Sequence, residues 1–130
     1  FQVIKDIESA NGIYLGPRSY PVNDGSITDL ILPRMGIRVL PESVGTLTNL
    51  AQIDLYGNEL TRIPQSIGEL KSLQRLNLGS NKLESLPESI GNLESLRRLN
   101  IKGNQLSNIP EEIERILETL KENGCNVDRG

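Results

Sequence analysis

A sequence repeat of 23 residues constrains the fold of this chain more than any other feature. Asn58, Asn81 and Asn104 are 23 positions apart, and a proline follows each of them six residues later. Four consecutive units begin near residues 27, 50, 73 and 96, and the seven apolar positions of the unit hold Leu, Ile or Val in all four. A regular repeat of this length is typical of a solenoid, in which each unit buries its apolar face only against its neighbours.

Each unit contains a short segment with the periodicity of a β-strand. In residues 52–56 apolar and polar side chains alternate, which predicts a strand with one buried and one exposed face. An asparagine follows the strand in three units, and its amide can both donate to and accept from the backbone of adjacent coils. We therefore assign a structural role, as a stacked ladder, to Asn58, Asn81 and Asn104. The prolines at positions 64, 87 and 110 are expected to end the strand pairing and to turn the chain into the convex segment.

The repeated pattern resembles the leucine-rich-repeat family. Residues 27–116 follow L-x-x-L-x-L-x-x-N-x-L and then x-x-[IL]-P-x-x-[IV]-G-x-L, and the sequence LPESIG at residues 86–91 is similar to the intracellular 23-residue class. That class includes small archaeal and bacterial repeat proteins, plant intracellular repeat proteins and scaffolds of Ras-type signalling. The resemblance implies an α/β fold: a right-handed solenoid whose parallel strands line a concave face.

Both ends of the chain are predicted to form helices that cover the open ends of the solenoid. We expect residues 1–26 to form an N-terminal helical cap and connection, residues 27–110 the four repeats, and residues 111–130 a C-terminal capping helix and tail. The supporting apolar stripes are Val3, Ile4 and Ile7 at one end and Ile113, Ile116, Leu117 and Leu120 at the other. Asn11 and Gly12 are expected to end the first helix, and residues 13–26 are expected to be irregular.

Composition argues against several classes of function. The chain has no His, which removes the commonest general base, and its one cysteine, Cys125, has no matching His. No metal-ligand spacing, phosphate loop or dinucleotide motif is present, so no catalytic, cofactor or metal residue is assigned. The net charge of −3 disfavours nucleic acid as a partner. No apolar run reaches the roughly 18–20 residues of a membrane span. We predict a cytoplasmic monomer without a cofactor.

The strand pattern also predicts which side chains face a partner. Alternate strand positions point to the concave face, and the partner-binding residues predicted there are Gln52, Asp54, Tyr56, Arg75, Asn77, Arg98, Asn100 and Lys102. Across four strands this face has an apolar and acidic end and a basic end. The basic end predicts a partner with an acidic or phosphate-bearing segment.

The first unit leaves one question open. Ile31 falls at an outward position, and Met35 replaces the ladder asparagine. They form either an exposed contact patch or a surface that the N-terminal segment covers, and we favour the second because first repeats are usually atypical. The predicted function is a protein- or peptide-binding module, part of a signalling or scaffold protein. The alternative is a solenoid that supports a neighbouring domain or associates with itself.

Overall fold

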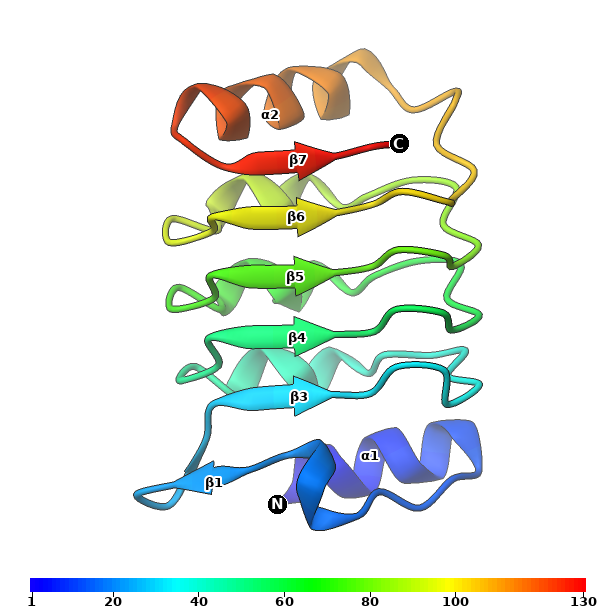
Figure 1. Cartoon of the computed structure of the whole chain (residues 1–130), viewed down its shortest axis with the longest axis vertical. Helices are drawn as coiled ribbons and strands as arrows, with labels where there is room; N and C mark the ends of the chain where they lie inside the picture. Colours follow the sequence, from blue (N-terminus) through cyan, green and yellow to red (C-terminus); the bar gives the residue numbers. More distant parts are fainter.

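The computed structural model describes residues 1–130 as a stack of coils built on one parallel sheet (Figure 1). Five strands lie side by side in chain order: β3 (Asp29–Ile31), β4 (Gln52–Asp54), β5 (Arg75–Asn77), β6 (Arg98–Asn100) and β7 (Asn126–Asp128). The residues paired between β3, β4, β5 and β6 are 23 positions apart. The sequence repeat therefore becomes a spatial repeat without any shift in register, as the resemblance implied.

The convex side of the coils consists of short 3-10 helices behind the sheet. These are η2 (Glu42–Thr46), η3 (Gln65–Glu69) and η4 (Glu88–Asn92), each immediately preceded by a proline of the repeat. Pro64 and Pro87 have φ near −70° and an extended ψ, and neither can donate a backbone hydrogen bond to a sheet. The expected turn into the convex segment is therefore confirmed at both prolines. They do not end the strand pairing, because β4 and β5 end ten residues earlier, at Asp54 and Asn77.

Neighbouring coils pack closely on this convex side. A Cβ added to Gly45 would lie 2.6 Å from the Cβ of Ser66, and one added to Gly68 would lie 2.8 Å from the Cβ of Ser89. Carbon atoms that are not bonded to each other do not approach this closely, so a residue without a Cβ, glycine, is needed at both positions. The G in the repeat pattern therefore sets the spacing between coils.

A continuous aliphatic core fills the space between the sheet and the convex helices. It is a single cluster of 31 buried residues with no aromatic member. Leu76 on β5 is 1% exposed, and its register partners Ile53 and Leu99 are also buried. The repeat positions that are only partly buried pack against this core, and they are Leu47, Leu106, Ile109 and Ile116.

The three ladder asparagines bond to the backbone of two coils each. Asn81 is 7% exposed, its Nδ2 donates to the carbonyls of Leu55 and Leu78 at 2.9 and 3.1 Å, and its Oδ1 accepts from the N–H of Leu60 at 3.0 Å. Asn58 and Asn104 bond to equivalent backbone groups one coil earlier and one coil later. Each side-chain amide thus forms hydrogen bonds with buried or partly buried backbone groups.

Replacing a ladder asparagine should therefore cost more than replacing an asparagine of the concave face. We expect Asn81→Ala to lower the free energy of unfolding by about 1–3 kcal/mol, because buried backbone groups lose their partner. Asn77→Ala should cost less, about 0.5–1 kcal/mol, because water can replace the hydrogen bonds of this half-exposed side chain to Gly79 and Asn100. Urea denaturation of both variants measures the difference, and equal losses would contradict it.

The two long helices lie at opposite ends of the stack (Figure 1). Helix α1 (Gln2–Asn11) packs against η2 and ends at Gly12, which has a left-handed φ of 64°. Asn11 is buried and joins α1 to the residues that precede η2, because its Oδ1 accepts from the N–H of Arg38 and its Nδ2 donates to the carbonyl of Val39. Helix α2 (Glu111–Glu122) packs against η4 and buries Ile113, Leu117 and Leu120.

The segment after α1 is more regular than the sequence analysis expected. It contains a 3-10 helix, η1 (Pro17–Ser19), and a two-stranded antiparallel hairpin of β1 (Val22–Asn23) and β2 (Ser26–Ile27). Asp24 and Gly25 connect the strands with φ values of 50° and 79°. Aspartate followed by glycine tolerates two positive φ angles in succession, which is what a tight hairpin requires. The expectation of an irregular connection was therefore wrong for residues 22–26.

The expected C-terminal tail is also wrong in part, because it forms β7 and extends the sheet. Asn126 pairs with Arg98, Val127 with Leu99 and Asp128 with Asn100. The paired positions are 28 residues apart because α2 is longer than the 3-10 helices of the other coils. An ion pair fastens the new strand to α2, since both terminal nitrogens of Arg129 donate to Glu114 at 2.7 and 2.9 Å. This bond lowers the pKa of the Glu114 carboxyl below its ordinary value.

Candidate functional site

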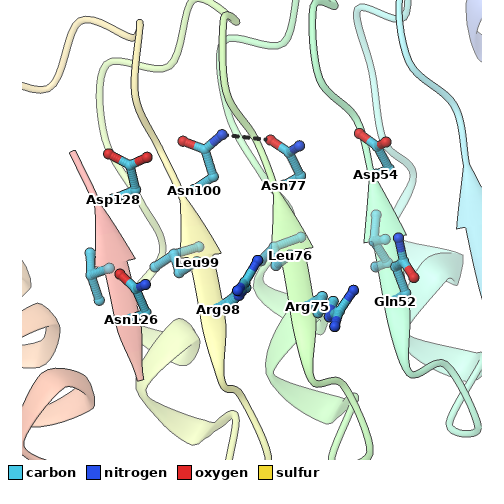
Figure 2. A pocket seen from close by; sticks show the side chains of 12 residues that line it. Gln52, Asp54, Arg75, Leu76, Asn77, Arg98, Leu99, Asn100, Asn126 and Asp128 are labelled. Carbon is cyan, nitrogen blue, oxygen red and sulfur yellow. Dashed lines mark hydrogen bonds between the residues drawn. The ribbon is translucent and has the colours of Figure 1, made fainter. Parts of the chain in front are cut away.

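The concave face presents two parallel rows of side chains, and Figure 2 shows from close by the part of each row that lies on β4 to β7. The first, here called the arginine row, crosses the sheet at the start of each strand and contains Asp29, Gln52, Arg75, Arg98 and Asn126. The second, here called the amide row, crosses at the end of each strand and contains Ile31, Asp54, Asn77, Asn100 and Asp128. Parallel pairing in register brings each row into line across the sheet.

The amide row is held rigid by hydrogen bonds to its own strands. In Asp54, Asn77, Asn100 and Asp128 the Oδ1 atom accepts from the backbone N–H two residues later, in each case at 3.0 Å. The Nδ2 of Asn100 also donates to the Oδ1 of Asn77 at 3.0 Å, as the dashed line in Figure 2 marks. These side chains are therefore already oriented before any partner arrives.

The arginine row carries two cations that nothing in the chain neutralises. Arg75 and Arg98 are exposed and directly paired across β5 and β6. Neither guanidinium takes part in the ion pairs or hydrogen bonds of the structure. Their backbones are one strand spacing apart, about 4.8 Å, so the two like charges repel.

A depression of about 510 Å³ over strands β4 to β7 joins the two rows. Six of the predicted partner-binding residues line it, and they are Gln52, Asp54, Arg75, Asn77, Arg98 and Asn100. Tyr56 and Lys102, also predicted, lie outside it. The depression is completed by β7, which supplies Asn126 and Asp128. These two residues were not among the predicted partner-binding residues, although the polar-apolar-polar pattern of residues 126–128 matches that of residues 98–100.

This extra strand corrects the predicted charge layout of the face. With four strands, Arg75 and Arg98 were expected at a basic end. In the five-stranded sheet they lie away from both edges, with neutral Gln52 on one side and neutral Asn126 on the other. A carboxylate, Asp128, also lies beyond them. The positive charge is therefore central in the groove.

Tyr56 is less available to a partner than the sequence suggested. The guanidinium carbon of Arg34 lies 5.6 Å from the centre of its ring, within the range of a cation–π contact. On the other side, a Cβ on Gly79 would lie 3.1 Å from the ring, so glycine leaves the room that the ring occupies. Hydrogen bonding by the side chains of Ser80 and then Arg34 lowers the pKa of Tyr56. Its ring is thus half-buried by its own chain.

The contacts around Tyr56 are held by strained backbone. Arg34 and Ser80 have φ values of 54° and 52°, whereas the equivalent positions of the second and fourth units are Gly57 and Gly103. A left-handed conformation costs a residue with a Cβ roughly 1–2 kcal/mol. The chain therefore keeps non-glycine residues at the two positions whose side chains reach Tyr56.

Ile31 and Met35 of the first repeat are both partly covered in the structure. Ile31 is half-buried, and η1 of the N-terminal segment contacts its strand, β3. Met35 is half-buried and packs against the core, and its N–H donates to the Oδ1 of Asn58 at 3.0 Å. The two residues do not form an exposed patch, so the covered alternative describes them better. Val39, another outward aliphatic, is 49% exposed.

Other features bear on chemistry and partners. The structure contains no group of three or more His, Cys, Asp or Glu side chains arranged to hold a metal ion. Burial raises the pKa of the Cys125 thiol, which disfavours the thiolate that a nucleophile requires. Neither α1 nor α2 has the length and apolar character needed to span a membrane.

The parallel sheet built from successive sequence repeats defines the chain as a solenoid repeat protein. Residues 28–127 match the family described as leucine-rich repeat region, and the chain belongs to the leucine-rich-repeat family. Domains of this family generally mediate interactions between proteins and are typically not enzymes. Among curated proteins, no match to this sequence was found.

Solved structures similar to this chain come from bacteria and from a plant. A leucine-rich-repeat protein of Leptospira interrogans is 35% identical with a TM-score of 0.69, over 78% of this chain and 25% of that one. An internalin from Listeria monocytogenes is 29% identical with a TM-score of 0.56, over 65% and 23%. The leucine-rich-repeat ectodomain of a receptor kinase from Arabidopsis thaliana shares the fold at 19% identity, with a TM-score of 0.72 over 98% and 89%. This chain thus spans about a quarter of the two bacterial proteins.

Proposed function

We propose that this domain binds a protein or peptide through its concave face, and that an acidic or phosphate-bearing segment of the partner docks on Arg75 and Arg98. The observation that carries the proposal is the pair of exposed, unneutralised guanidiniums in the centre of a polar groove. Stability gives no reason to hold two like charges side by side, whereas a carboxylate or phosphate would accept hydrogen bonds from both.

The dimensions of the groove favour an extended segment as the occupant. The sheet is five strands wide, so the face spans roughly 19 Å across the strands, and the three-residue strands span about 10 Å. The area enclosed by these two lengths is well below the roughly 800 Å² that each partner contributes to a standard interface. A peptide or a projecting loop fits such a site better than a broad protein surface does.

We also propose that this domain is a monomer and is part of a cytoplasmic signalling or scaffold protein.

Reversing the two charges should abolish binding and leave the fold intact. We expect Arg75→Glu/Arg98→Glu to melt within a few degrees of the wild type, because both side chains are exposed. A partner captured by the immobilised wild-type domain should be lost by this variant, and its affinity for the wild type should fall as salt increases. Quantitative pull-down followed by titration of the isolated partner measures both effects.

The matched control is Arg62→Glu/Arg97→Glu, which changes the net charge equally at two exposed arginines outside the groove. It should keep the partner. If both double variants bind the partner as the wild type does, the arginine pair is not the site. Light scattering of the domain alone tests self-association, and a mass that rises with concentration would make a second copy of the chain the occupant.

A further inference from the structure

The amide row carries negative charge at both sides of the groove and none between. Asp54 lies on β4 and Asp128 on β7, while the residues between them in the row are Asn77 and Asn100. The Oδ1 atom of each carboxylate accepts a hydrogen bond from the backbone N–H two residues later, which closes a turn. Neither carboxylate takes part in an ion pair. Arg129, the residue after Asp128, is held by Glu114 instead.

The fold does not require these two charges. The side chains of Asn77 and Asn100 make the same hydrogen bond to the backbone, at the same 3.0 Å, as those of Asp54 and Asp128. A neutral amide therefore closes the turn as well as a carboxylate does. The groove thus has two cations at its centre and a carboxylate without an ion-pair partner on each side. The carboxylates accept a backbone hydrogen bond, but that bond does not need their charge.

We propose that the groove selects an extended segment in which an acidic residue is flanked at two positions before and two positions after by Lys or Arg. This inference rests on the proposed docking of an acidic group at Arg75 and Arg98. The two basic side chains of the segment would bind Asp54 and Asp128. The occupant is thus a peptide of basic-x-acidic-x-basic sequence that crosses the strands.

The spacing of the charges matches that of an extended chain. From β4 to β7 there are three strand spacings, about 14 Å in total. In an extended peptide every second side chain points to the same face, and four residues advance about 13 Å. When the central acid lies over Arg75 and Arg98, between β5 and β6, the side chains two residues away on either side therefore lie over β4 and β7.

The groove also offers hydrogen bonds to the backbone of such a peptide. The side-chain amides of Gln52 and Asn126 line it and make no hydrogen bond in the structure. In Figure 2 they flank Arg75 and Arg98 in the arginine row. Arg75 and Arg98 lie in the arginine row, whereas Asp54 and Asp128 lie in the amide row, two residues further along each strand. The side chains of the domain's arginines and of the peptide's Lys or Arg residues are long enough to span this distance.

The proposed pairing of the peptide's basic residues with Asp54 and Asp128 is tested by measuring the binding of three peptides to the wild type and to variants. The probes are three blocked peptides: GKSESKG, its rearrangement GKKSSEG, and GSSESSG, which lacks the lysines. Dissociation constants are measured at low salt from shifts of the Arg Nε and side-chain amide signals in NMR spectra of the isotope-labelled domain. On the wild type we expect GKSESKG to bind about three- to tenfold tighter than GKKSSEG, the sum expected from two exposed ion pairs.

The variant Asp54→Asn/Asp128→Asn should keep its fold and lose this preference. It should bind GSSESSG as tightly as the wild type does or more tightly, because only repulsion of the acid has been removed. The control Glu69→Gln/Glu94→Gln removes two exposed charges outside the groove and should keep the preference. Equal binding of GKSESKG and GKKSSEG, a preference that survives in Asp54→Asn/Asp128→Asn, or no binding of GKSESKG at millimolar concentration would overturn the inference. The docking of an acid on the arginines fails separately, if Arg75→Glu/Arg98→Glu binds GSSESSG as the wild type does.

Discussion

Deletion of residues 111–130 should leave a chain that aggregates or melts far below the intact domain. The deletion removes Ile113, Leu117 and Leu120, which are between 0% and 5% exposed in the structure. Each fully buried side chain of this size contributes about 1.5–3 kcal/mol, and whole domains are stable by only about 5–15 kcal/mol. The deletion also uncovers Ile90 and Ile101 of the last repeat, which are buried in the intact chain.

Thermal melting followed by circular dichroism, with light scattering of the same sample, measures the effect. A shorter deletion of residues 124–130 removes β7 but keeps α2, and should cost less because the buried face of α2 remains. A soluble deletion of residues 111–130 with an unchanged melting temperature would show that the terminal segment is an appendage. It would then become a candidate for binding a partner.

Leu76→Ala should lower the free energy of unfolding by about 2–5 kcal/mol, the range for truncating a buried leucine in a close-packed core. Leu76 is 1% exposed on β5, in the middle of the sheet, with buried neighbours in register on both sides. Denaturant unfolding at equilibrium gives the free energy directly.

The matched control is Arg75→Ala, the preceding residue, whose side chain points to the exposed face of the same strand. It should change stability by about 0.5 kcal/mol or less. A loss below that value for Leu76→Ala would contradict the assignment of buried and exposed strand faces on which the whole site depends.

The fold was predictable because a repeat protein is stabilised mainly by contacts between neighbouring units. Residues 23 positions apart, such as Leu76 and Leu99, meet in register, so a pattern visible in the sequence is also the pattern of contacts. The prolines before η3 and η4 act locally, through a fixed φ, and they begin the convex helices as predicted, although the strand pairing ends earlier.

Elements outside the repeat were predicted less well. The hairpin at residues 22–27 had a local signal in Asp24 and Gly25, but its pairing depends on two very short strands. Strand β7 had no signal at the 23-residue step, since that step from Arg98 falls inside α2. The cation–π contact between Arg34 and Tyr56 requires a left-handed backbone at Arg34, which sequence alone favours only for glycine.

The repeat pattern alone predicts that Arg75 and Arg98 are neighbours on an exposed face, because identical repeat spacing forces identical register. Their position in the centre of the groove, with Asp54 and Asp128 on either side, follows from the three-dimensional packing of the last coil. Where the sheet ends depends on how α2 packs on the last coil and returns the chain to the concave face. That packing is set by contacts in three dimensions, which a fixed sequence period does not encode.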